Sequence, residues 1–274
     1  MSLTEMVDSW EPVPNPQAET ATYADGDFLA GGSVHLWAYP SRCVAGHSNR
    51  SVLPEWARQA RDLDLSPVLQ ADSDQQQENA LTWLGAELLI SLYAGIAPAK
   101  VRLAARGTGR KPHLDPETHA DCPLKFNLSH SGGWTLLALA CGREVGVDLE
   151  KERVFREPLR FAKRFLHPTE VDYLQLIRRD ARSEGLRRLW VRKEAAAKAT
   201  GFGLPLGLAS FSAVGEGSVP PGDWHELSLK KARAEGLCAW ALQSLPDLPG
   251  LAACVCVEGA AADAPHLRFR QLPG

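Results

Sequence analysis

The sequence contains no long hydrophobic run, because none of its apolar stretches reaches the roughly 18 residues that a membrane-spanning helix requires. Its first ten residues, MSLTEMVDSW, also lack the basic and apolar regions of a signal peptide. We therefore expect a soluble, cytoplasmic chain without a membrane partner.

Paired cysteines and repeats are missing as well. The six cysteines form no C-x-x-C pair, which disfavours a metal or disulfide site. Cys254 and Cys256 stand two positions apart in an apolar run, so on a strand both would face one side, and we interpret them as a reduced, buried pair. No repeat of solenoid or propeller length recurs. With 23 Gly and 19 Pro, the chain is neither collagen-like nor of low complexity.

A large net charge is also absent, yet the formal value of −3 hides two segments of opposite charge. Residues 1–30 contain six acids and no Lys or Arg, and we interpret them as a solvated tail. Residues 151–193 contain 13 basic residues against six acids, a local net charge of +7. This basic segment either forms solvated helix faces or docks an acidic partner.

The 274 residues, of which 45% are hydrophobic, suit one large domain or two small ones. Strands precede and follow a group of helices, which favours an α+β fold over a doubly wound sheet. The short link between the strands 134–140 and 145–149 suggests an antiparallel hairpin. Hydrophobic patterning predicts helices over 79–93, 159–166, 169–179 and 184–200, and strands over 34–39, 101–105, 134–140, 145–149, 208–214, 224–230, 237–242 and 251–257.

Two carboxylates, Asp148 and Glu150, alternate in the segment VGVDLE and would share one face of a strand. Neighbouring carboxylates repel each other, and a divalent cation relieves that repulsion. Oxygen-only ligands favour Mg²⁺ or Mn²⁺ over zinc. In the alternative interpretation, both side chains lie on a solvated strand face and pair with Arg or Lys.

An acid and a base follow Trp190 at helical spacing. Trp190, Glu194 and Lys198 stand at i, i+4 and i+8, and therefore line one stripe of a helix. Because Trp190 belongs in the core, this stripe is expected to turn inward. The alternative is an ordinary helix-stabilising pair of Glu194 and Lys198.

The segment FNLSHS at 126–131 suits phosphate binding, because it offers the Ser129 hydroxyl and the His130 imidazole beside small residues. We place both residues in a turn before the strand 134–140. The predicted hairpin would bring His130 to within about 15 Å of the two carboxylates. A hydrolase pair is disfavoured, since no G-x-S-x-G elbow surrounds Ser129.

The loop GTGRKP at 107–112 carries two adjacent cations, Arg110 and Lys111, beside glycines. It is either a phosphate grip or an ordinary surface turn, because it lacks the G-K-[ST] and the strand–loop–helix context of a P-loop.

Taken together, in this order and spacing, the segments GTGRKP, FNLSHS, GVDLE and WVRKEAAAKATGFGL resemble the 4′-phosphopantetheinyl transferases, most closely the long, surfactin-synthetase-activating type. The resemblance covers about half of the chain, from Asn79 to Val214. It implies transfer of phosphopantetheine from coenzyme A to a serine of an acyl or peptidyl carrier protein, with release of adenosine 3′,5′-bisphosphate. It also implies Mg²⁺ as cofactor, a monomer, and no nucleic-acid partner.

The same resemblance implies a two-part fold and a set of site residues. After the tail 1–30, two similar α+β halves related by pseudo-two-fold symmetry, 31–143 and 144–274, would hold coenzyme A in the cleft between them. The implied metal ligands are Asp148, Glu150 and Glu194, the implied catalytic residues are Glu194, Lys198 and His130, and the implied coenzyme A contacts are Thr82, Arg110, Lys111, Pro112, Ser129, His130 and Lys198. Glu194 is the candidate acceptor of the serine proton, directly or through water.

The resemblance leaves several points open. The family usually carries Lys or Arg around the helix of Thr82, but here no cation occurs from Asp62 through Ala99. A non-catalytic homologue that binds coenzyme A or a carrier protein is therefore one alternative, and a metal-dependent phosphodiesterase is another. The basic segment 151–193 would dock the acidic carrier protein. Fatty-acid, polyketide and nonribosomal-peptide carriers all remain possible partners.

Overall fold

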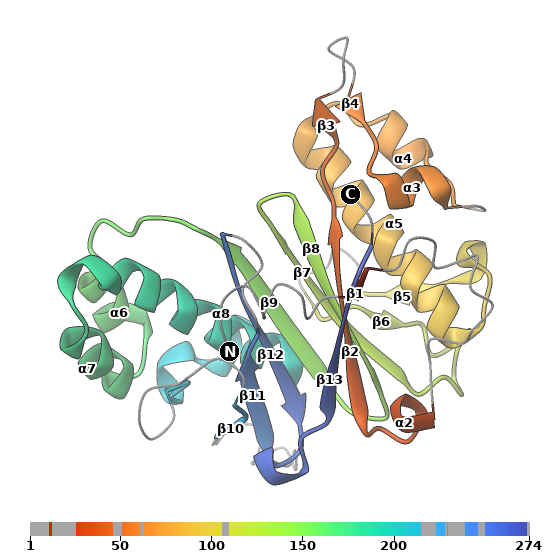
Figure 1. Cartoon of the computed structure of the whole chain (residues 1–274). Helices are drawn as coiled ribbons and strands as arrows, with labels where there is room; N and C mark the ends of the chain where they lie inside the picture. The colour runs from red at the N-terminus through yellow and green to blue at the C-terminus, as the bar shows by residue number, and fades with distance from the viewer. Residues whose placement is uncertain are drawn as a thin grey trace.

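The protein is described by a computed structural model that covers residues 11–12, 26–45, 51–60, 63–105, 110–214, 223–227, 229, 239–245 and 250–272. Most of the predicted acidic tail and the GTG of the loop at 107–109 lie outside the described residues. Two sheets form the centre of the molecule, and helices lie on their outer sides (Figure 1). The predicted α+β class is confirmed.

The first sheet has the strand order β1-β13-β2-β8-β7. Its long members are β2 (Ser33–Pro40), β7 (Leu124–Ser131), β8 (Trp134–Cys141) and β13 (His266–Gln271), and β1 (Glu11–Pro12) lies at one edge. β13 pairs in parallel with β2, while β7, β8 and β2 pair antiparallel. The last strand of the chain is thus inserted beside the first long one.

Helix α5 (Asp74–Ala94) covers the outer face of this sheet. It begins where the Ser73 side chain accepts a hydrogen bond from the Gln76 backbone N–H, and it ends at Gly95, whose φ of 67° is left-handed. The prediction of a helix over 79–93 is confirmed, and the cap at Ser73 extends it by one further turn.

The second sheet has the order β10-β11-β12-β9, with every pair antiparallel. Its strands are β9 (Val145–Lys151), β10 (His225–Leu227), β11 (Trp240–Ser244) and β12 (Leu251–Glu258). Helix α8 (Arg182–Thr200) packs on its outer face, next to α6 (Pro158–Phe165) and α7 (Pro168–Leu176). The three helices predicted for this region are confirmed.

The inner faces of the two sheets share one hydrophobic core. Leu36 of β2, Leu136 of β8, Val147 of β9 and Val255 of β12 are all fully buried in it. The opposite faces of the same strands point to the helices, so that Cys254 and Cys256 are buried together against α8 with free thiols, as predicted. The layers therefore run helix, sheet, sheet, helix.

Shorter elements connect these layers. They are α2 (Gly26–Leu29), α3 (Glu55–Gln59), α4 (Ser66–Leu69), β3 (Val44–Ala45), β4 (Ser51–Val52), β5 (Leu103–Ala104), β6 (His113–Leu114) and 3-10 turns at Pro98–Lys100, Arg179–Ala181, Leu204–Leu206, Leu208–Ser210 and Ala261–Asp263. The strand predicted over 101–105 is reduced to β5.

The predicted hairpin of 134–140 and 145–149 is wrong. Both strands exist, but β8 pairs with β7 and β2 in the first sheet, whereas β9 pairs with β12 in the second. The link between them turns at Gly142, whose φ is 67°, and carries the chain from one sheet to the other.

Two further local predictions are wrong. Ser129 and His130 lie at the end of strand β7 and not in a turn, because the turn is formed by Gly132 and Gly133 with φ of 63° and 81°. The segment 208–214 forms a 3-10 turn and a loop and not a strand, because buried side chains bind its backbone groups. The division at 143/144 remains a prediction, and β13 of the later part lies in the first sheet.

Candidate active site

The candidate site lies where the two sheets meet, along strands β7 and β9. Ser129 donates a hydrogen bond of 2.8 Å to Asp148 Oδ1, and Ser131 donates one of 3.0 Å to Glu150 Oε2. The Asn127 side chain of β7 also accepts from the Val147 N–H at 2.9 Å. The residue numbers of the contacting pairs increase in the same direction along both strands, so β9 runs parallel to β7. The serines of β7 therefore face the carboxylates of β9. The two strands belong to different sheets, so side-chain contacts between them, and not the predicted hairpin, bring Ser129 and Ser131 to the carboxylates.

Helix α8 adds a cation to this row. Lys198 Nζ lies 2.6 Å from Asp148 Oδ1 and donates a hydrogen bond of 2.9 Å to the Ser129 hydroxyl. Glu194 lies one turn earlier on the same half-buried stripe, and Trp190 one turn before that packs edge-on against Phe161 of α6. The stripe predicted from the spacing of these residues does face the carboxylates.

Two carboxylates of the site, those of Asp148 and Glu194, have raised pKa values. Burial raises the pKa of Asp148, although Lys198 and Ser129 favour its ionised form. Burial also raises the pKa of Glu194, and the negative charges of Asp148 and Glu150 add to that rise. Burial is the main cause of both shifts, and the neighbouring carboxylates add a smaller contribution of the same sign.

A close approach of backbones explains the glycine of GVDLE. A Cβ added at Gly146 would lie 2.2 Å from the Ala199 nitrogen and 2.3 Å from the Ala195 oxygen. Any side chain would push α8 away from β9 and separate Lys198 from Asp148.

Two arginines that sequence reasoning missed hold Glu150. The buried Arg187 donates to the Glu150 backbone carbonyl at 2.7 Å and binds Glu184 through two of its nitrogens at 2.8 Å. Arg153 lies 3.4 Å from Glu150 Oε1. Both arginines belong to the basic segment 151–193, but its composition alone does not distinguish arginines that contact Glu150 from cations that are exposed to solvent.

At the same end of β7, on the face opposite Ser129 and Ser131, helix α5 lies beside β7 and β8. His130 Nδ1 is 3.6 Å from Glu78 Oε1, so this imidazole faces a carboxylate that the sequence did not point to. Thr82 is buried, and its hydroxyl lies 3.0 Å from that of Thr135. The predicted contact of Thr82 with a phosphate remains a prediction.

Lys111 and Pro112 line a pocket of about 410 Å³ together with Lys125, Glu144 and Thr200. Lys111 Nζ lies 2.5 Å from Glu144 Oε2 and donates a hydrogen bond of 3.2 Å to the Ala199 carbonyl. Burial lowers the pKa of Lys111, and Glu144 offsets part of that shift.

This pocket reaches the end of α8, because Thr200 lines it and Lys111 donates to the Ala199 carbonyl, but Glu194 and Lys198 are not among its lining residues. Arg110, also predicted to contact a ligand, is exposed next to the pocket lining. Glu144 was missed by the sequence analysis, since a lone acid before a strand carries no motif.

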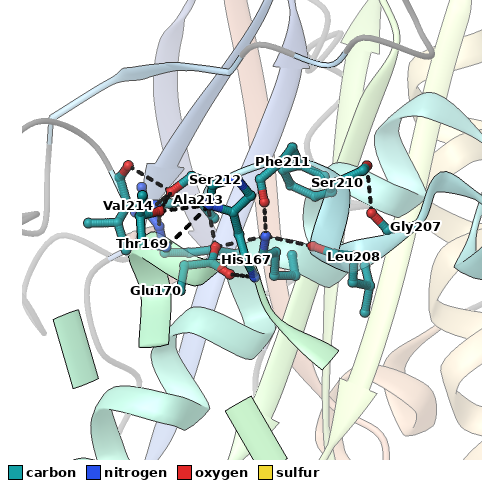
Figure 2. A network of polar contacts seen from close by, with 12 residues as sticks. His167, Thr169, Glu170, Gly207, Leu208, Ser210, Phe211, Ser212, Ala213 and Val214 are labelled. Atoms are coloured by element: carbon teal, nitrogen blue, oxygen red, sulfur yellow. Dashed lines mark hydrogen bonds and ion pairs between the residues drawn. The ribbon is translucent and has the colours of Figure 1, made fainter. Parts of the chain in front are cut away.

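Behind α8 lies a second polar network, which Figure 2 shows from close by. The fully buried side chains of Lys193 and Glu170 form an ion pair of 2.8 Å. Lys193 also donates to the carbonyls of Leu208 and Phe211, and Glu170 accepts from the Ala213 N–H at 2.7 Å. The network fastens α7 and the loop 207–214 to the helix that carries Glu194. Burial lowers the pKa of Lys193 to about 8.

The predicted metal ligands do not form a ready-made metal cluster. Among the residues that the structure describes, no group of three or more His, Cys, Asp or Glu side chains is arranged to hold an ion. Two of the three carboxylates are instead engaged by protein cations, Asp148 by Lys198 and Glu150 by Arg153. Within the same part of the chain, no helix is long and apolar enough to cross a membrane.

Comparison with known proteins relates part of this chain to one family. Residues 144–256 match the 4′-phosphopantetheinyl transferase superfamily. A 4′-phosphopantetheinyl transferase of Bacillus subtilis is 34% identical over 142 residues, which are 50% of this chain and 59% of that protein. A putative 4′-phosphopantetheinyl transferase of Synechocystis sp. is 32% identical over 135 residues, which are 49% and 54% of the two chains.

The 4′-phosphopantetheinyl transferase HetI of Nostoc sp. is 37% identical over 112 residues, which are 41% of this chain and 46% of that protein. The chain thus spans about half the length of the curated relatives it matches.

Proposed function

We propose that the protein transfers the 4′-phosphopantetheine moiety of coenzyme A to a serine hydroxyl of a carrier protein, because residues 144–256 match the 4′-phosphopantetheinyl transferase superfamily. The other product is adenosine 3′,5′-bisphosphate. The observation that carries this proposal is the convergence of Ser129, Asp148 and Lys198 within hydrogen-bond distance of one another, with Glu194 on the same helix stripe.

Phosphoryl transfer depends on positioning and charge neutralisation more than on covalent help from the protein. The Lys198 ammonium supplies a positive charge at the point where the sheets meet, and the neighbouring pocket supplies two more on Lys111 and Lys125. We assign this pocket of about 410 Å³ to coenzyme A, with Ser129 and His130 on the strand beside it. Thr82 and Arg110 remain further candidates for its phosphates.

The donor set fits Mg²⁺, with Mn²⁺ as a substitute. Asp148, Glu150 and Glu194 offer only oxygen atoms, which Mg²⁺ prefers as ligands, and the negative charges of Asp148 and Glu150 contribute to the raised pKa of Glu194. When bound, the ion neutralises negative charge on the phosphates of the substrate. The three carboxylates would hold it.

Glu194 is the proposed acceptor of the proton from the carrier serine. No hydrogen bond or ion pair joins its carboxylate to another residue in the described part of the chain, and burial raises its pKa. Lys198, one turn later, would bind the transferred phosphate. His130 would orient the phosphates of coenzyme A from the end of β7.

The carrier protein would dock on the basic segment 151–193. Two hollows of about 330 and 520 Å³ adjoin on this segment and share Phe155, Arg156 and Arg160 in their linings. Arg164 stacks over Phe165 at 5.1 Å on the rim of the first hollow. An aromatic floor with an arginine rim suits an acidic helical partner with apolar side chains. The protein would act as a monomer in the cytoplasm.

The test is incubation of the protein with Mg²⁺, coenzyme A and an apo carrier protein, followed by intact mass spectrometry of the carrier. We expect the carrier to gain the mass of phosphopantetheine, and a carrier whose target serine is replaced by alanine to gain none. Binding of coenzyme A without a mass gain would instead favour a non-catalytic homologue, which the engaged carboxylates Asp148 and Glu150 also permit. Loss of coenzyme A without modification of the carrier would indicate hydrolysis.

A further inference from the structure

The Asp148 carboxylate already has a cation in this structure. Lys198 Nζ lies 2.6 Å from Asp148 Oδ1, and the Ser129 hydroxyl joins both groups at 2.9 and 2.8 Å. The Asp148 side chain is 9% exposed. A buried carboxylate without a partner is strongly destabilising, so the ammonium of Lys198 is what allows Asp148 to stay charged inside the protein.

Lys198 is a removable partner, unlike the other buried cations of this helix. Its side chain is 29% exposed, whereas Lys193 on the same helix is fully buried and bound on several sides. A lysine ammonium is a compact charge on a flexible stem. Lys198 also stands in the last turn of α8, where the helix dipole favours a cation in several orientations. It can therefore leave Asp148 without losing a favourable environment.

A divalent cation and the Lys198 ammonium compete for the same carboxylate oxygen. Two cations on Asp148 Oδ1 would repel each other at close range. Glu194, one turn before Lys198 on α8, forms no hydrogen bond or ion pair with another described residue.

We propose that Lys198 is the resident counter-ion of Asp148 in the metal-free protein, and that it moves off Asp148 into the cleft when a divalent cation binds. This inference rests on the proposed function, because it assumes that Asp148 is a ligand of the ion. Metal binding would thereby free the Lys198 charge for an anionic substrate. The coupling is reciprocal: whatever removes Lys198 from Asp148 must strengthen metal binding by the same factor.

The first test uses the unmodified full-length protein without coenzyme A. Its lysines are acetylated with a small amine reagent, with and without Mn²⁺, and each site is quantified by peptide mass spectrometry. We expect Mn²⁺ to raise the labelling rate of Lys198 about fivefold or more. The exposed Lys163 and the buried Lys193 are internal controls whose rates should stay unchanged. An unchanged or lower rate at Lys198, or no binding of Mn²⁺ at all, overturns the proposal.

The second test measures the Kd for Mn²⁺ by electron paramagnetic resonance. The variant Lys198→Gln should bind Mn²⁺ about 5- to 10-fold more tightly than the unmodified protein. Lys100→Gln, which removes one exposed positive charge away from the candidate site, controls for net charge and should change Kd little. Equal or weaker binding by Lys198→Gln contradicts the exchange.

Neither measurement depends on transfer. A carrier protein that gains mass while Lys198 labelling ignores Mn²⁺ would leave the proposed function standing and reject the exchange of cations. The opposite pair of results would reject the transferase activity alone.

Discussion

The Lys193 ammonium and the Glu170 carboxylate form an ion pair of 2.8 Å in which both side chains are completely buried. Lys193 directly precedes Glu194 in the chain, so the pair holds α8 in the rotation that places Glu194 near Asp148 and Glu150. The same two side chains satisfy the backbone of the loop 207–214. A polar anchor inside the protein thus supports the stripe that carries the candidate chemistry.

Breaking this pair from one side should be costly. We expect Lys193→Met or Glu170→Leu to lower the free energy of unfolding by about 3–5 kcal/mol, because each leaves a buried charge without its partner. The double variant should lose clearly less than the sum of the two, since no unpaired charge remains. Urea unfolding of the four proteins measures this coupling, and simple additivity would show that the pair contributes nothing as a pair.

The contact of β9 with α8 makes Gly146 sensitive to the smallest side chain. Gly146→Ala should destabilise the protein by about 2–3 kcal/mol, because the added methyl group meets backbone atoms of Ala195 and Ala199. Gly26→Ala is the matched control, since no atom lies within 4 Å of its added Cβ. Thermal unfolding monitored by circular dichroism distinguishes them, and an equal stability of both variants would argue against this close packing.

Glu194→Gln should impair turnover far more than coenzyme A binding. The amide keeps the size of the side chain but cannot accept a proton, so we expect kcat to fall by about 10²–10⁴ while the Kd for coenzyme A changes little. Glu117→Gln, a substitution at an exposed acid, should behave like the unmodified protein. Near-normal turnover of Glu194→Gln would refute the assignment of this residue as the base.

Docking of the carrier protein should depend on salt and on the arginines of α6. Exposed charges are screened over about 8 Å at physiological ionic strength, so KM for the carrier should rise with added salt. Arg160→Glu and Arg164→Glu should raise that KM by about tenfold and leave KM for coenzyme A unchanged.

Arg58→Glu is the control for this series, because Arg58 is exposed on α3 and lies outside both hollows and outside the segment 151–193. If neither added salt nor the charge reversals on α6 change KM for the carrier, the docking surface lies elsewhere.

The ion pair of Lys111 and Glu144 in the pocket should affect the stability of the protein at acidic pH. Burial by itself would raise the pKa of Glu144, but Lys111 and Lys125 outweigh it and hold the pKa below its usual value of 4.5. A lowered carboxyl pKa in the folded state adds stability above the unfolded value, and this contribution disappears as the pH falls through the folded value.

The variant Glu144→Gln should therefore be less stable than the unmodified protein by about 1–2 kcal/mol near pH 7. The difference should shrink when the pH falls below about 4.5. Chemical unfolding at a series of pH values measures both. A difference that grows toward low pH would have the wrong sign for this pair.

Local patterns in the sequence were sufficient to predict the elements that are specified by helical spacing or by strand alternation. The stripe of Trp190, Glu194 and Lys198 follows from helical spacing alone, and the shared face of Asp148 and Glu150 follows from strand alternation. For this reason the helices α5 to α8 and the strands β2, β8, β9 and β12 were predicted close to their actual bounds. The residue types of the candidate site were recognisable for the same reason.

Strand pairing and burial were decided only by the tertiary structure. A short link between two strands predicts a hairpin. However, β8 and β9 each bury one face against helices and the other in the shared core. The two strands bury both faces because they lie in different sheets that pack against each other. The support of the site by Arg187, Glu144 and Glu170 was invisible in the sequence. Each of these residues acts across 30 or more positions, and the cost of burying a charge is set by neighbours that only the folded chain brings together.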